Sequence, residues 1–163
     1  MILPSAFCIL TSSYHMVGFP SCNFVSFVVN DSYFCILTSL IYCLVYSPQV
    51  LDYFEHPRNP GVVNAPDASA QVENPVCGDI LKLTARISQD RIVEIKFLAK
   101  GCVPAMACAS ALAEFLQGKT LAEAAAFKRE ELVLKLGGLP EASTHASHLA
   151  IDAIAALVRN APK

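Results

Sequence analysis

Two glycine-flanked cysteines and a nearby aspartate are the residues of this chain best suited to metal chemistry. Cys77 lies in the segment 74–79, with Asp79 two positions after it, and Cys102 directly follows Gly101. Neither cysteine belongs to a CxxC pair, so the pattern does not indicate a zinc ribbon or a thioredoxin-type site. Thiolates are soft ligands that bind zinc or iron–sulfur clusters. The sequence therefore predicts a metal site, if folding brings the two cysteines together.

The chain between Cys77 and Cys102 is expected to fold so that the two cysteines come together. Residues 81–87 and 92–97 alternate apolar and polar side chains, a period typical of half-buried strands. Residues 88–90 supply a short turn between them. An antiparallel hairpin returns the chain to the end at which it began, so Cys77 and Cys102 should face each other.

Helix signals surround the predicted hairpin. Ser47 followed by Pro48 is typical of a capped helix start, and Thr120 and Glu123 have the spacing of a capping box. Strands that precede most of the helices indicate an α+β fold, with a small antiparallel three-stranded sheet and helices packed on one face. Helices are predicted over 48–56, 105–116, 129–136 and 144–158, and a further helix is predicted to begin at residue 120. A short strand is predicted near 70–72, inside a mobile loop at 62–75.

Charge divides the 163 residues into two parts. Residues 1–45 contain one carboxylate, Asp31, and no Lys or Arg, whereas residues 46–163 have an ordinary globular balance. We expect residues 46–163 to be the folded domain and residues 1–45 to be disordered or translated upstream DNA, because valine at position 45 is what an internal GTG start codon would display. A membrane anchor at 33–45 is an alternative, although this stretch is shorter than the roughly 20 residues of a span. The third possibility is that residues 1–45 form a genuine folded element.

Net charge and cysteine distribution limit the partners and the compartment. A net charge of −2 argues against nucleic acid as a main partner. Cys77, Cys102 and Cys108 follow the charge break. Three cysteines in a soluble body, two of them beside glycine, suit a reduced cytosolic protein better than a disulfide framework. We therefore expect a cytoplasmic protein without a membrane partner.

Further motifs lie around the two cysteines. They are Tyr46-Ser47, Val50-Leu51-Asp52-Tyr53-Phe54, Pro57-Arg58-Asn59-Pro60-Gly61, Asn74-Pro75-Val76-Cys77-Gly78-Asp79, Gly101-Cys102, Gly118-Lys119-Thr120-Leu121 and Asp152-Ala153-Ile154. In this order and spacing, residues 46–160 resemble the IscU/NifU-type scaffold proteins of iron–sulfur cluster assembly. The resemblance implies a non-enzymatic scaffold that assembles a transient [2Fe-2S] cluster from iron and desulfurase-derived sulfur and passes it on. The implied partners are a cysteine desulfurase, recipient apo iron–sulfur proteins and a chaperone pair, and the isolated protein is expected to take up zinc as well.

The resemblance also implies a ligand set. Cys77 and Cys102 fall on the family's first and second cysteines, Asp79 on its aspartate and His145 on its histidine. The third cysteine normally follows that histidine directly, but Ala146 stands here, so the chain is a variant without it. Because the third cysteine is often assigned the acceptance of persulfide sulfur, the sulfur-delivery route is open. A mixed set of thiolates, carboxylate and imidazole suits a cluster that must be released.

Two further residues are alternative ligands. Cys108 lies on the helix face of Leu112, which favours a buried thiol, although it is also placed to replace the missing third thiolate. His148 comes three residues after His145 and is either solvated or a ligand of the same metal.

The backbone beside the cysteines has two more expected features. Cys102 lies just before a helix N-terminus, where backbone N–H groups and the helix dipole favour the thiolate. Gly78 and Gly101 have no Cβ, so the chain can turn tightly and a cofactor can approach.

Two other functions remain open. A zinc-bound sulfur acceptor resembling the SufU branch would work with a cysteine desulfurase, but that branch carries an insertion and retains the third cysteine, and neither is seen here. A degenerate regulatory subunit would bind a desulfurase without metal. The missing cysteine favours it, whereas intact Cys77, Asp79, Cys102 and His145 oppose it.

Overall fold

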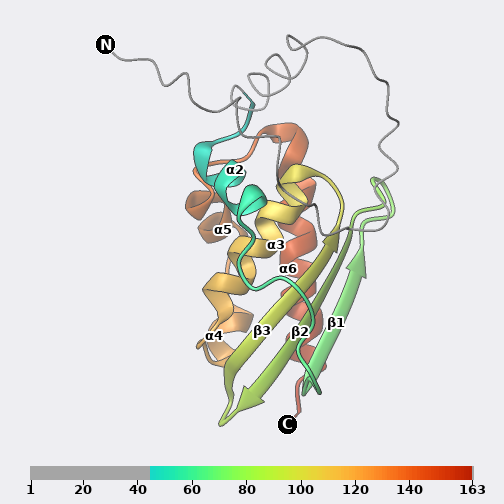
Figure 1. The fold of residues 1–163 in the computed structure, drawn as a ribbon, viewed down its shortest axis with the longest axis vertical. Helices are drawn as coiled ribbons and strands as arrows, with labels where there is room; N and C mark the ends of the chain where they lie inside the picture. Colours follow the sequence, from blue (N-terminus) through green and yellow to red (C-terminus); the bar gives the residue numbers. More distant parts are fainter. Residues whose placement is uncertain (1–44, 163) are drawn as a thin grey trace, which may run out of the picture. The chain divides into compact units, whose positions relative to one another are not determined.

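The computed structural model describes residues 45–162, which form an α+β fold (Figure 1). The predictions for residues 1–45 fall outside this range apart from Val45. Within residues 45–162, no helix is long and apolar enough to cross a membrane.

The sheet contains three antiparallel strands in the order β1-β2-β3. Strand β1 spans Ala68–Glu73, β2 spans Ile80–Ser88 and β3 spans Arg91–Lys100. The two-residue turn between β2 and β3 has positive φ at Gln89 (51°) and Asp90 (63°), as in the type I′ turns that match the twist of a hairpin. The predicted three-stranded sheet and its hairpin are confirmed.

The helices pack on one face of this sheet, with α3 and α6 against the strands (Figure 1). The predicted capping signals are present: the Ser47 hydroxyl accepts the N–H of Val50, and Thr120 and Glu123 form a capping box. A 3-10 turn before α6, which the sequence analysis missed, spans Glu141–Ser143. The helices are α2 (Pro48–Glu55), α3 (Val103–Leu116), α4 (Leu121–Ala126), α5 (Arg129–Lys135) and α6 (Thr144–Arg159).

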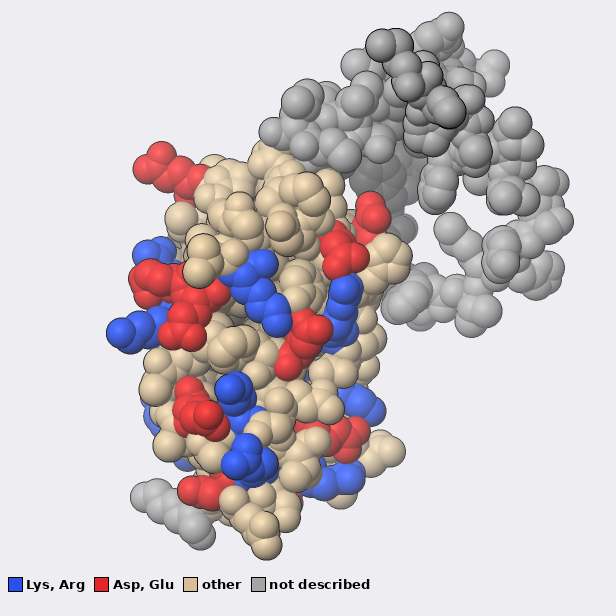
Figure 2. Space-filling view, turned by 90° about the vertical axis from the view of Figure 1, so that its left-hand side faces the viewer, with Lys and Arg blue, Asp and Glu red and all other residues tan. Residues whose placement is uncertain are grey.

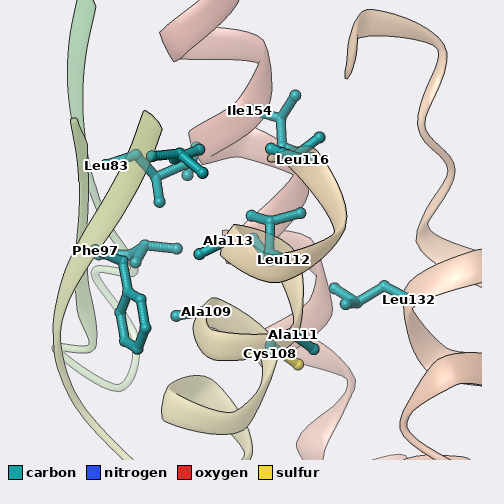
Figure 3. Close-up of a cluster of buried hydrophobic side chains, with 14 of the residues drawn as sticks. Leu83, Phe97, Cys108, Ala109, Ala111, Leu112, Ala113, Leu116, Leu132 and Ile154 are labelled. Carbon is teal, nitrogen blue, oxygen red and sulfur yellow. The ribbon is translucent and has the colours of Figure 1, made fainter. Parts of the chain in front are cut away.

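The core lies between the sheet and α3, α5 and α6 (Figure 3). Leu83 and Phe97 reach it from the sheet, and Leu112 is fully buried on α3. Ala109 and Ala113, also buried, face the strands and let the α3 backbone approach them closely (Figure 3). This packing fixes the N-terminus of α3 against the end of the sheet.

The segment before β1 is packed and hydrogen-bonded. Gly61 N–H donates to the Phe97 carbonyl at 2.8 Å, and Val63 N–H donates to Thr84 Oγ1 at 3.0 Å. Val63 is only 1% exposed. The prediction of a mobile loop over 62–75 was therefore wrong at its start, because an apolar side chain and backbone N–H groups find partners on the sheet.

The surface carries both signs of charge. On the face shown in Figure 2, Lys and Arg side chains are interspersed with Asp and Glu. Ion pairs among the described residues include Lys135 with Glu114 at 3.0 Å and Arg58 with Asp52 at 2.6 Å. The described residues of that face therefore form no extended basic surface of the kind that attracts nucleic acid.

Candidate metal centre

The four side chains predicted as ligands come from three parts of the chain. Cys77 and Asp79 lie between β1 and β2. Cys102 is the N-cap of α3, directly after β3, and His145 lies in the first turn of α6. Since α6 packs against β1, β2 and α3, its N-terminal turn can meet the same end of the sheet as the two cysteines.

A hydrogen-bonded turn presents Cys77. Gly78 N–H donates to the Asn74 carbonyl at 2.8 Å, and Val76 N–H donates to Asn74 Oδ1 at 2.9 Å. Gly78 has a φ of +71° with nothing within 4 Å of a built Cβ, so glycine is needed here for its left-handed backbone. The turn leaves Cys77 exposed.

The structure brings all four side chains together. The ligand atoms of Cys77, Asp79 and His145 lie within 4.8 Å of one another. Cys102 Sγ is 3.4 Å from Asp79 Oδ2 and 3.6 Å from His145 Nε2, and that Nε2 is 3.6 Å from Asp79 Oδ2. Two thiols, a carboxylate and an imidazole thus form one cluster, and that they bind metal stays a prediction.

Gly101 makes room for the Asp79 carboxylate. The register of the hairpin pairs Ile80 with Lys100, so Asp79 lies opposite Gly101. A Cβ built on Gly101 would lie 2.6 Å from Asp79 Oδ1 and 2.7 Å from its Cγ. The sequence predicts that Gly101 lets a cofactor approach, whereas the close neighbour of Gly101 in the structure is Asp79. Extending the predicted hairpin by one residue pair would have found this contact.

Asp79 is held in place although it is buried. It is 5% exposed, and its Oδ1 accepts the Cys102 N–H at 3.3 Å. A buried carboxylate is costly without partners, and here the Cys102 amide and thiol and the His145 ring supply them. Its position depends on the start of α3.

His145 is oriented as a ligand from its other ring nitrogen. Nδ1 lies 3.0 Å from the Ala142 carbonyl. Because a carbonyl oxygen only accepts, Nδ1 donates to it and carries a proton, and Nε2 is the ring nitrogen that faces Cys102 and Asp79. A hydrogen bond of this kind fixes the tautomer of metal-binding histidines.

The Cys102 thiol departs from expectation. Burial raises its pKa; the Ala105 backbone N–H acts in the opposite direction, and the Asp79 carboxylate raises it further. The Ala105 N–H thus favours the thiolate, as predicted for a helix N-terminus, but burial outweighs this effect in the metal-free protein. Metal binding at Cys102 must release a proton.

Neither of the two alternative ligands belongs to the described Cys77, Asp79 and His145 cluster. Cys108 is fully buried among core side chains (Figure 3), and burial raises its pKa to about 12. It is a neutral core thiol, as its helix face predicted. His148 is exposed, and its Nε2 lies 3.3 Å from Arg129 Nη1. The Arg129 guanidinium disfavours a cation there.

Position 146 does not open to solvent. Ala146 is 1% exposed and belongs to the hydrophobic core. Its side chain has no donor atom for a metal or for sulfur. The fold and the site together define a small α+β protein in which thiol, carboxylate and imidazole groups converge at one end of a hairpin.

Comparison with known proteins assigns the family. Residues 45–162 match the NifU-like N terminal domain, and the chain belongs to this family. The iron-sulfur cluster assembly scaffold protein IscU 1 of Archaeoglobus fulgidus is 41% identical over 110 residues, which cover 68% of this chain and 72% of that protein. The IscU scaffold protein of Azotobacter vinelandii is 38% identical over 121 residues, covering 72% and 94%.

A solved structure supports the fold. The N-terminal part of a nitrogen-fixing NifU-like protein from Brucella abortus superposes with a TM-score of 0.59, covering 71% of this chain and 93% of that one. The sequence identity is 23%, so this likeness concerns the fold alone.

Proposed function

We propose that this chain is a scaffold on which a [2Fe-2S] cluster is assembled and from which it is transferred to apo-proteins. Its relatives carry the name iron-sulfur cluster assembly scaffold protein. The observation that carries the proposal is the convergence of Cys77, Asp79, Cys102 and His145. In this role the cluster is cargo, and the protein acts as a scaffold rather than as an enzyme.

The four side chains are the proposed cluster ligands. Thiolates suit the soft iron–sulfur core, whereas the carboxylate oxygen of Asp79 is a harder and weaker partner for it. Cys77 is exposed, and the His145 side chain is 35% exposed, so a recipient protein has access to the cluster. A site of this composition favours release, as transfer requires.

The chain is proposed to do this without a third cysteine. Ala146, directly after His145, stands where the family resemblance places that residue. Cys108 is excluded as a substitute by its burial and its neutral thiol. Asp79 and His145 therefore complete the ligand set beside the two cysteines.

A cysteine desulfurase, recipient apo iron–sulfur proteins and a chaperone pair are the proposed partners, and the cytoplasm is the proposed compartment. Cys77, Cys102 and Cys108 are all free thiols, which suits a reducing compartment. The ligand set itself requires reduced cysteines.

Zinc binding is the second candidate function, as in a zinc-bound sulfur acceptor. The same observation supports it, because thiolate, imidazole and carboxylate groups in one cluster also suit tetrahedral zinc. Anaerobic reconstitution with quantification of iron, sulfide and zinc separates the candidates. Iron and sulfide in equal amounts support the scaffold, zinc alone supports the sulfur acceptor, and a protein that stays metal-free contradicts both.

A further inference from the structure

The proposed function requires a thiol that takes up sulfur. A cysteine desulfurase presents sulfur as a persulfide on one of its own cysteines, and a scaffold receives it by nucleophilic attack. Ala146 cannot make this attack, since its side chain has no nucleophilic atom and is 1% exposed. Another thiol of the chain must therefore accept the sulfur.

The three described thiols differ sharply in access. Cys108 is fully buried in the core. Cys102 is partly buried at the N-cap of α3, with its Sγ enclosed by Asp79 and His145. Cys77 is the one exposed thiol among residues 45–162. A persulfide carried on a second protein can reach a sulfur atom only where that atom is exposed.

The turn that carries Cys77 projects into solvent. Val76, directly before it, is 93% exposed, so no described segment of the chain covers this side of the turn. Asn74 braces the turn through its carbonyl and its side chain. The thiol is thus presented on a defined turn.

The same thiol lies at the assembly site. Its Sγ is within 4.8 Å of ligand atoms of both Asp79 and His145. Sulfur bound to Cys77 would therefore arrive beside the other proposed ligands, with no second transfer along the chain. Among the three cysteines that the structure describes, exposure to a donor and proximity to the cluster site coincide only at Cys77.

We propose that Cys77 is the sulfur-accepting thiol of this protein, an inference that rests on the proposed scaffold function. The Cys77 thiolate attacks the terminal sulfur of the desulfurase persulfide. A sulfur–sulfur bond forms at Cys77 as the bond to the desulfurase cysteine breaks, and the desulfurase thiolate leaves. The proton released from Cys77 balances the proton taken up by the leaving thiolate, and no net oxidation occurs.

The test is transfer of ³⁵S from labelled cysteine by the desulfurase of the source organism to the full chain, followed by peptide mapping under non-reducing conditions. We expect label on the peptide that contains Cys77, loss of that label in Cys77→Ser, and retention of it in Cys102→Ser. Cys108→Ser serves as the matched control, because a thiol buried in the core should not accept sulfur and its loss should leave the label at Cys77 unchanged. Circular dichroism of each variant shows that it is folded.

Other outcomes overturn the inference and remain separable from failure of the scaffold function. Label on the Cys102 peptide of the wild type, or unchanged labelling of folded Cys77→Ser, makes Cys77 the wrong acceptor. Wild-type protein is also reconstituted with ferrous iron and inorganic sulfide, which need no sulfur acceptor. A cluster formed there without label at Cys77 contradicts only the sulfur route, whereas label at Cys77 without any cluster supports the route and contradicts the scaffold function.

Discussion

Replacing Gly101 with alanine should destabilise the protein through Asp79 alone. Gly101 does not have a positive φ, so alanine fits the backbone, but its Cβ would lie 2.6 Å from Asp79 Oδ1. The carboxylate must move, which weakens its hydrogen bond from Cys102 N–H. Overpacking of this kind costs about 1–3 kcal/mol. The smaller conformational freedom of unfolded alanine returns about 0.4–1 kcal/mol, so we expect a net loss of about 1–2 kcal/mol.

A double-mutant cycle with Asp79→Ala isolates the contact. In that background both close contacts with the carboxylate are gone, and the contact with the Asp79 Cβ, at 3.0 Å, remains. Gly101→Ala should then change the free energy of unfolding by less than about 1 kcal/mol, giving a coupling energy of about 1–2 kcal/mol. Urea denaturation measures the free energy of unfolding of all four proteins, and an unchanged m-value shows that the four values can be compared.

Gly118→Ala is the matched control. Gly118 has a φ of +80° and nothing within 4 Å of a built Cβ, so alanine there costs backbone strain without any contact with Asp79. Its destabilisation should be equal in the wild-type and Asp79→Ala backgrounds. If Gly101→Ala also costs the same in both, the carboxylate is not what the glycine accommodates, and our account of this contact is refuted.

Four further predictions concern the site and the core. Alanine at Cys77 or at Cys102 should abolish the visible absorbance of a reconstituted sample, because each substitution removes a soft ligand. Full absorbance in either variant would contradict the ligand assignment. Asp79→Ala should slow cluster transfer to an apo-ferredoxin, since the hard ligand that favours release is gone, and unchanged kinetics would remove Asp79 from the site. Ala146→Cys places a thiol in the hydrophobic core, where Ala146 is 1% exposed, so the lifetime of the cluster, measured as iron content after gel filtration, should stay unchanged; a longer lifetime would mean that position 146 faces the metal. Burial raises the pKa of Cys108 to about 12, above the roughly 8.5 of an unfolded thiol. The folded state therefore holds this proton while the unfolded state loses it, and stability should fall by about 2 kcal/mol between pH 7 and pH 10. Cys108→Ala should lack this part of the alkaline loss, and an identical pH profile of the free energy of unfolding would contradict it.

Features encoded within a few residues could be predicted from the sequence. Ser47 and the Thr120–Glu123 pair cap their helices as expected, and the turn at Gln89 and Asp90 closes the predicted hairpin. The approach of Cys77 to Cys102 followed from that hairpin. These features depend on local hydrogen bonds and on the alternation of side chains.

Features set by packing between distant segments could not be derived in this way. The position of His145 beside the cysteines depends on how α6 lies on the sheet, and only the family resemblance pointed to it. The raised pKa of Cys102 depends first on burial, which outweighs the local effect of the helix N-terminus. The packing of Val63 against the sheet was missed because its partner, Thr84, lies on β2.

Timed transfer of the cluster tests the central claim most directly. The protein is reconstituted anaerobically, freed of unbound iron and sulfide, and mixed with an apo-ferredoxin whose own spectrum reports the arrival of a [2Fe-2S] cluster. We predict equal amounts of iron and sulfide on the wild-type protein and their joint passage to the ferredoxin, with neither bound nor transferred by Cys77→Ala or Cys102→Ala. A wild-type protein that retains zinc alone, or that holds iron and sulfide without ever passing them on, would contradict the claim.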